Sequence, residues 1–186
     1  CYFECYRGGF TEESARRFPQ NVALEFLGKT LSYQELWGLA RRFAQGLKDL
    51  GVRPGDRVAI MLPNSPQFVI AFYGTLLAGG VGVNVNPLYT PRELRHQLAD
   101  AGAETLVILD HLLPRYLEVE KEVPVKRVVV TGIKDFLPFP KNLLYPLKAK
   151  RDGLPLGFPK REGFHAFAEL LKRPPAEPHV PDPEDL

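Results

Sequence analysis

The sequence predicts an α/β fold in which a doubly wound, mainly parallel sheet carries helices on both faces. The main observation is that strand-length apolar runs alternate with helical patterns from residue 22 to residue 130, an order typical of parallel sheets. The second is composition, because 45% hydrophobic and 25% charged residues in a chain of 186 are ordinary values for a globular protein. This length suits one domain, or one domain and a piece of another.

The first predicted elements are a small β-hairpin and a capped helix. Residues 22–27 (VALEFL) predict a strand, the next two residues turn the chain, and residues 30–32 return as the second strand. Ser32 and Glu35 have the spacing of a capping box, which indicates a helix start. Gly51 is the predicted end of this helix. Apolar residues at spacings of four and three share one stripe of it: Leu36, Ala40, Phe43, Leu47 and Leu50.

The second helix differs from the first because it has no polar face. Residues 57–62 (RVAIML) predict a buried strand, after which Ser65 caps the helix and Pro66 occupies its first turn. The helix sequence, QFVIAFYGTLLA, is apolar on nearly every side, so we expect it to be covered on both sides. Phe72→Asp should therefore be among the most damaging substitutions, unless part of the cover belongs to a segment outside this chain.

The alternation of strands and helices continues to residue 130. Thr90 and Glu93 form a second capping box for a helix that ends at Gly102, and a weaker helix covers residues 111–121. Each crossover between parallel strands should be right-handed. The remaining strands are expected at residues 81–85, 105–109 and 126–130.

The composition changes after Gly132. Ten of the 18 prolines lie from Pro138 onward, and residues 133–161 carry a net charge of +5, whereas residues 162–186 carry −4. The last 15 residues contain five prolines and predict an extended linker that is mobile when alone. We therefore divide the chain into an atypical or disordered start (1–11), an α/β subdomain (12–132), a basic segment rich in proline and aromatic residues (133–171) and a proline-rich linker (172–186).

The start of the chain is unusual. The first residue is not Met, and the only Met is Met61, so we expect that the chain begins inside a longer sequence or has lost its start. Cys1 and Cys5 are the only cysteines. They could be half of a metal site or a redox pair. A zinc site would need further ligands that the four scattered histidines do not supply, and an incidental pair is favoured. Without cysteine in the core, a reducing cytoplasm is the expected location, and the net charge of +2 does not indicate a nucleic-acid partner.

Two glycine-containing strings invite a nucleotide-binding interpretation that their context does not favour. Residues 28–30 (GKT) resemble the end of a phosphate-binding loop, but the position five before Gly28 is Ala23, inside a predicted strand. Residues 79–82 (GGVG) close a helix and open a strand, which is the reverse of the dinucleotide fingerprint. A hairpin turn and a helix stop are the favoured interpretations.

The sequence assigns no catalytic, cofactor-binding or metal-ligating residue. It contains no GxSxG, HExxH or CxxC pattern. Asp110 and His111 are adjacent, and they follow a predicted strand at the edge where parallel sheets often bind ligands. Adjacency in sequence does not make a catalytic pair, so a ligand role for these two residues is the weaker interpretation.

Residues 136–151 (FLPFPKNLLYPLKAKR) mix aromatic residues, prolines and bases. One interpretation is a surface for lipid head groups or for an apolar substrate. The other is a loop that packs its apolar residues into the domain. Pro138, Pro140 and Pro146 argue against one long amphipathic helix.

Several of these strings together resemble the start of the adenylate-forming superfamily, the AMP-dependent synthetases and ligases. LSYQEL (31–36) is similar to the first core motif, L-[TS]-Y-x-E-L, and residues 51–108 are similar in type throughout. The Leu-Lys-Ala-Gly of many members is Leu-Leu-Ala-Gly here. The resemblance covers residues 12–186. NPLYTPREL (86–94) and residues 134–151 are similar to bacterial long-chain fatty acid–CoA ligases in particular.

The resemblance implies that the complete enzyme joins a long-chain fatty acid to ATP, releases pyrophosphate, and transfers the acyl group from AMP to CoA. It implies ATP, Mg²⁺ and CoA as cofactors, with contact to a membrane surface and a homodimer left open. In the family a Thr/Ser/Gly-rich phosphate loop follows, and this chain stops at Leu186 before it. No site residue therefore carries over, and we expect the chain alone to be an inactive scaffold that binds none of these cofactors tightly. It would supply part of the acyl-tunnel wall or a dimer surface.

Two alternatives stay open. The chain could come from another acid–CoA ligase or adenylating enzyme of the same superfamily. It could instead be a free-standing, non-catalytic interaction module that retains only this subdomain.

Overall fold

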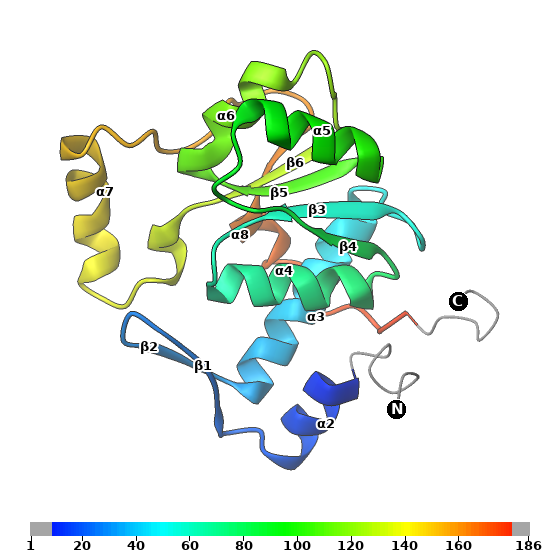
Figure 1. The fold of residues 1–186 in the computed structure, drawn as a ribbon. Coiled ribbons are helices and arrows are strands. Elements are labelled where there is room, and N and C mark those ends of the chain that lie inside the picture. The colour runs from blue at the N-terminus through cyan, green and yellow to red at the C-terminus, as the bar shows by residue number, and fades with distance from the viewer. Residues whose placement is uncertain (1–8, 180–186) are drawn as a thin grey trace.

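The structure, a computed structural model, describes residues 9–179 (Figure 1). Its centre is a five-stranded parallel sheet in the order β4-β3-β5-β6-β7. This confirms the predicted fold class, because the crossovers run in both directions from β3. The strands are β3 (Arg57–Met61), β4 (Val81–Asn84), β5 (Thr105–Leu109), β6 (Arg127–Thr131) and β7 (Phe164–Ala166).

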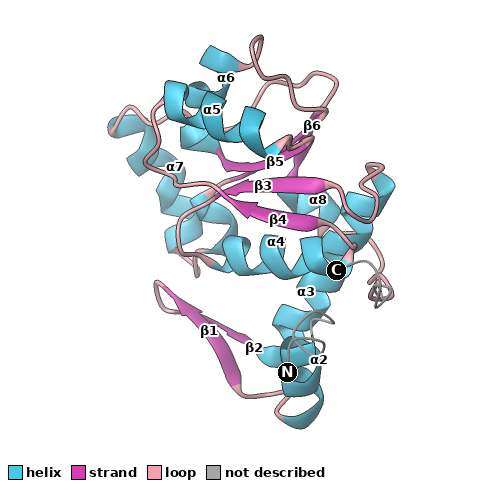
Figure 2. Cartoon of the chain, turned by 45° about the vertical axis from the view of Figure 1, so that its right-hand side comes forward, coloured by secondary structure: helices cyan, strands magenta, loops and turns pink. Residues whose placement is uncertain are grey.

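Helices cover both faces of the sheet, as Figures 1 and 2 show. One face carries α3 (Tyr33–Asp49), α4 (Pro66–Leu77) and the short α8 (Phe167–Leu170), and the other carries α5 (Pro91–Ala101) and α6 (Leu113–Val119). The hairpin of β1 (Val22–Phe26) and β2 (Lys29–Ser32) lies apart from the main sheet, and α2 (Gly9–Arg17) packs on α3 (Figure 2).

Both predicted capping boxes form. The Ser32 amide donates to Glu35 Oε2 at 2.8 Å and the Thr90 amide to Glu93 Oε2 at 2.8 Å, while each hydroxyl accepts from the carboxylate residue's backbone N–H. Hydrogen bonds from the backbone and side chain of Ser32 lower the pKa of Glu35, and those of Thr90 lower the pKa of Glu93. The ionised carboxylates therefore stabilise the starts of α3 and α5.

Helix α4 is not buried equally all round, which corrects the expectation for Phe72. Its inner face, including Gln67, Ile70 and Ala71, is buried against the sheet and α3. Phe72 is only half-buried: its ring lies beside Gly82 of β4, where an added Cβ would be 3.3 Å from Phe72 Cδ2, and it stacks on Phe68 at a centroid distance of 6.2 Å. An apolar composition on all sides therefore did not distinguish the fully buried residues of α4 from the partly buried ones, although no residue of this helix is fully exposed.

The sheet and its core extend past residue 132. Strand β7 pairs with β6, and Phe167 and Leu170 of α8 are buried against it, with the Phe167 ring 4.6 Å from that of Phe43. Two 3₁₀ turns, η1 (Asp110–Leu112) and η2 (Ile133–Phe136), follow β5 and β6. The proposed boundaries at 12, 132 and 171 remain predictions, but the compact unit is larger than residues 12–132.

Residues 141–151 form a helix despite Pro146, contrary to our expectation for this stretch. Helix α7 (Lys141–Arg151) begins directly after Pro140 and contains Pro146 in its interior. The proline removes one N–H donor to the carbonyl of Asn142. Asn142 is exposed, so water can satisfy that carbonyl and the helix continues.

Residues 174–179, in the described part of the proline-rich segment, have neither helix nor strand and are docked on the body of the protein. The Ala176 amide donates to the Arg41 carbonyl at 3.0 Å, and the His179 amide donates to the Leu77 carbonyl at 2.9 Å. Ala176 is buried, and Arg41 Nε donates to its carbonyl at 2.7 Å. These contacts fasten residues 174–179 to α3 and α4. The two cysteines lie outside the described residues.

Candidate functional site

The carboxyl ends of the strands bring polar groups from three segments together. Gln67 of α4, Asp110 after β5 and Gly132 after β6 meet there, with Gln67 Nε2 donating to the Gly132 carbonyl at 3.0 Å. A Cβ on Gly132 would lie only 3.0 Å from Asp110 Oδ2, so the backbone approaches the carboxylate closely. Because the chain order reverses between β3 and β5, this is the sheet edge where such folds bind ligands.

This cluster holds buried polar atoms without partners. Gln67 is 1% exposed, and its Oε1 accepts no hydrogen bond within the described residues. His111 Nδ1 is equally unpaired there and lies 3.6 Å from Asp110 Oδ1, beyond hydrogen-bond distance. Asp110 Oδ1 instead accepts the backbone N–H of His111 at 2.8 Å. The predicted candidate pair is therefore brought to the edge but is not arranged as an acid–base couple.

The η2 turn that follows β6 is closed by the carboxylate of Asp135, one of its own residues. Asp135 Oδ2 accepts from Thr131 Oγ1 at 3.0 Å and from the Gly132 amide at 2.9 Å. Tyr145 of α7 lies close enough to be influenced: burial, followed by the charges of Asp110 and Asp152, raises the pKa of its phenol. Taken together, this edge can orient a polar group, while the carboxylate of Asp135 serves to close the turn.

Both glycine-containing strings have the structural roles that their context favoured. Phe26 pairs with Lys29 across the hairpin turn, and the Lys29 ammonium lies 5.2 Å from the centre of the Phe136 ring rather than in a loop of amides. Gly79, with φ of +87°, ends α4, and a side chain on Gly80 would meet the Asp56 carbonyl at 3.1 Å. Neither string forms a phosphate site.

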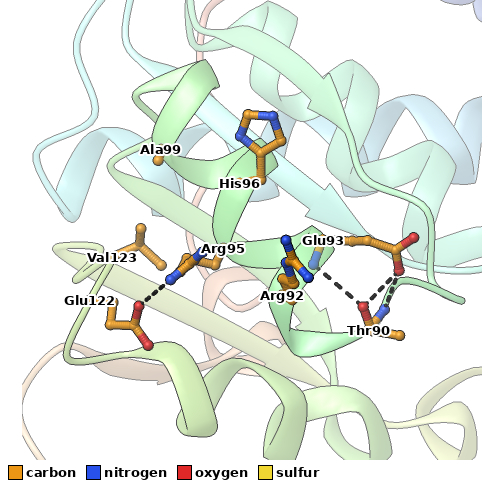
Figure 3. Close-up of a pocket in the computed structure, with 8 residues that line it drawn as sticks. All are labelled: Thr90, Arg92, Glu93, Arg95, His96, Ala99, Glu122 and Val123. Atoms are coloured by element: carbon orange, nitrogen blue, oxygen red, sulfur yellow. Dashed lines mark hydrogen bonds and ion pairs between the residues drawn. The ribbon is translucent and has the colours of Figure 1, made fainter.

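A shallow groove of about 780 Å³ runs between α5 and the segment after α6 (Figure 3). Arg95 crosses it to Glu122, with Nη1 2.5 Å from Oε2, and Glu93 is engaged by Thr90. The side chains of Arg92 and His96 also line the groove, and neither makes a hydrogen bond within the described part of the chain. The groove therefore offers surface bases, while its Thr90 hydroxyl is used in the capping box of α5.

Outside this groove, an arginine at the start of β6 hydrogen bonds to the backbone. Arg127 donates to the carbonyls of Leu50 at 2.6 Å and Gly51 at 2.8 Å, so its guanidinium is not free for a phosphate. Across residues 9–179 no group of three or more His, Cys, Asp or Glu side chains could hold a metal ion. No helix in this range is long and apolar enough to cross a bilayer.

Sequence reasoning missed Gln67 and Tyr116. The signal for Gln67 was a lone amide at the start of an otherwise apolar helix. Tyr116 is buried, and its hydroxyl accepts the Val125 amide at 3.1 Å; burial, partly offset by this bond, raises the pKa of the phenol. Nothing local in the sequence distinguishes it from a surface tyrosine.

Comparison with known proteins gives the family. The family model described as AMP-binding enzyme matches residues 11–186. The long-chain-fatty-acid–CoA ligase of Bacillus subtilis (strain 168) is 43% identical over 165 residues, covering 89% of this chain and 29% of that protein. Its counterpart in Escherichia coli O157:H7 is 40% identical over 134 residues, covering 72% of this chain and 24% of that one. The chain therefore spans less than a third of the length of these curated relatives.

A solved structure supports the fold independently. The acetoacetyl-CoA synthetase of Streptomyces lividans superposes with a TM-score of 0.73 at 23% identity, over 95% of this chain and 26% of that one. At this identity the likeness shows the fold alone. The family match over nearly the whole sequence goes further, and on that evidence the chain belongs to the AMP-binding enzyme family.

Proposed function

We propose that this chain is part of a long-chain fatty acid–CoA ligase, for which it supplies scaffold rather than catalytic groups. The observation that carries the proposal is the 43% identity to the Bacillus subtilis ligase over 89% of the chain. The complete enzyme would join a fatty acid carboxylate to the α-phosphate of ATP and release pyrophosphate. The CoA thiol would then displace AMP to form the thioester.

The described residues do not fit ATP or Mg²⁺. No cluster of acidic ligands is present among them, and the glycine-containing strings form a hairpin turn and a helix stop. We therefore derive no chemical step through either group from these residues. In the proposed enzyme the carboxyl edge around Gln67 and Asp110 would form one wall of a site that other segments complete. Homodimer formation remains a prediction.

The proposal can be tested with a chimera. The matching 165-residue segment of the Bacillus subtilis ligase is replaced by the corresponding residues of this chain, and acyl-CoA formation is measured with palmitate, acetate and benzoate. The matched control replaces the same segment with that of the Streptomyces lividans synthetase, which has a similar fold at lower identity.

We expect the first chimera to form palmitoyl-CoA and to prefer palmitate, and the control to lose most of this activity. A soluble, folded first chimera that is inactive with palmitate would contradict the proposal. A change of preference to acetate or benzoate would assign the chain to a different acid–CoA ligase.

A further inference from the structure

Helix α7 stands beside the sheet and is attached to the molecule by one face only (Figure 1). Ala149 is buried and Tyr145 is half-buried, so these two residues face the body of the protein. Leu143, Leu144 and Leu147 are 69%, 56% and 69% exposed. Residues at these spacings share one side of a helix, so α7 presents a row of leucines outward.

Two further exposed apolar side chains lie near the start of α7. Phe139, immediately before the helix, is 81% exposed, and Leu27 at the tip of the β1–β2 hairpin is 55% exposed. Lys141 Nζ donates to the Leu27 carbonyl at 3.0 Å, which joins the hairpin tip to the start of α7. We call these five residues the α7 patch: Leu27, Phe139, Leu143, Leu144 and Leu147. Soluble proteins seldom gather so many large apolar side chains on one exposed surface without a binding role.

Bases flank the leucines on the same helix. Lys148, Lys150 and Arg151 are exposed, and no described carboxylate pairs with either lysine, while Arg151 reaches Asp152 at 3.5 Å. Residues 133–161 carry a net charge of +5. Leucines bordered by long basic side chains are the pattern of helices that lie in a membrane interface, because the bases can reach head groups while the leucines enter the acyl region.

We propose that the α7 patch is a lipid-binding surface that inserts its leucines into the interface of an anionic bilayer. A second copy of the chain is the less suitable occupant. A symmetric contact through α7 would bring together two segments (residues 133–161) that each carry a net charge of +5, and like charges oppose it. A bilayer containing anionic lipid offers an acyl region to the leucines and negatively charged head groups to the bases. Vesicle binding requires no turnover, so this proposal is independent of the proposed ligase activity.

The test is co-sedimentation of the 186-residue chain with vesicles of phosphatidylcholine, with and without about 30% phosphatidylglycerol, a range in which surface charge is appreciable. We expect binding to the anionic vesicles that weakens as salt is raised. The double variant Leu143→Gln/Leu147→Gln should bind both vesicle types roughly tenfold more weakly. Lys148→Gln/Lys150→Gln should lose roughly tenfold on anionic vesicles and little on neutral ones.

Matched controls are Leu88→Gln, at an 81% exposed leucine outside the patch, and Lys121→Gln, at an exposed lysine outside it; neither should change binding. Circular dichroism checks that each variant is folded. The proposal is overturned if the parent ignores anionic vesicles, or if the leucine variant binds as the parent does. A parent dimer that the leucine variant dissociates, with vesicle binding unchanged, would identify a protein interface instead.

Discussion

Neighbouring residues of α4 are predicted to differ sharply in their contribution to stability. Ile70 is fully buried, whereas Phe72 is half-buried, near Phe68 and Tyr73. Ile70→Asp should prevent folding, because its carboxylate would have neither water nor a partner. Phe72→Asp should cost about 1–2 kcal/mol, since its carboxylate can reach solvent. Urea denaturation compares the two variants, and equal losses would mean that Phe72 is covered as completely as Ile70.

His165 should make stability depend on pH near neutrality. Burial first, and then the charge of Arg127, lowers the pKa of His165 in the folded chain. Between that pKa and the ordinary value of about 6.5, the unfolded chain binds more protons than the folded one, so stability falls as the pH drops through this range.

Thermal melting from pH 8 to pH 5 tests this expectation. The parent should lose more stability on acidification than His165→Gln does. His96→Gln, at an exposed position, is the control and should behave as the parent. An identical pH profile for parent and His165→Gln would show that His165 is not responsible.

At the scale of elements, two glycines of α3 have opposite roles. A Cβ on Gly46 would lie 2.5 Å from Leu170 Cβ, so α8 can approach α3 only because that position lacks a side chain. Gly38 has no atom within 4 Å of its Cβ position. Gly46→Ala should therefore destabilise by about 1–3 kcal/mol, whereas Gly38→Ala should stabilise by about 0.5–1 kcal/mol through helix propensity. Denaturation midpoints that shift in the same direction for both variants, relative to the parent, would refute this assignment.

The docked C-terminal segment should resist proteolysis. Residues 174–179 are held to α3 and α4 by backbone hydrogen bonds and by Arg41, while residues 152–157 are exposed. Limited subtilisin digestion should therefore cut the loop after α7 before it cuts residues 174–179. Arg41→Ala should make the segment sensitive, and Arg42→Ala, at an exposed neighbour, should not. First cleavage of the parent within residues 174–179 would restore the interpretation of a mobile linker.

The elements that sequence reasoning predicted well have local signals. The Ser32 and Thr90 capping boxes, the apolar stripe of α3 and the Val-rich strands depend on residues a few positions apart. What it missed depends on contacts far apart in sequence. Strand β7 has only three residues and is defined by its pairing with β6. Ala176 is buried against α3, where its hydrogen-bond partner Arg41 lies 135 positions earlier in the chain. The unpaired Gln67 belongs to the same class, since its burial requires α4 to pack on the sheet.

At the scale of the whole molecule, the structure has the framework of an AMP-binding enzyme without a chemical centre among its described residues. The sheet, both helix layers and the carboxyl edge are present. The polar groups at that edge, Gln67, Asp110 and His111, lack the geometry of a nucleophile and its base. Family resemblance identified the kind of enzyme, whereas composition and spacing alone indicated only a doubly wound scaffold.

The most direct test of this account is AMP release from palmitate, ATP, Mg²⁺ and CoA, measured for the isolated 186-residue chain beside the Bacillus subtilis chimera. The scaffold role predicts that the chain alone releases no more AMP than a sample without protein, while the chimera turns over. Release by the isolated chain above that background, absent from a heat-denatured sample, would contradict the account, because these residues would then contain a catalytic site of their own.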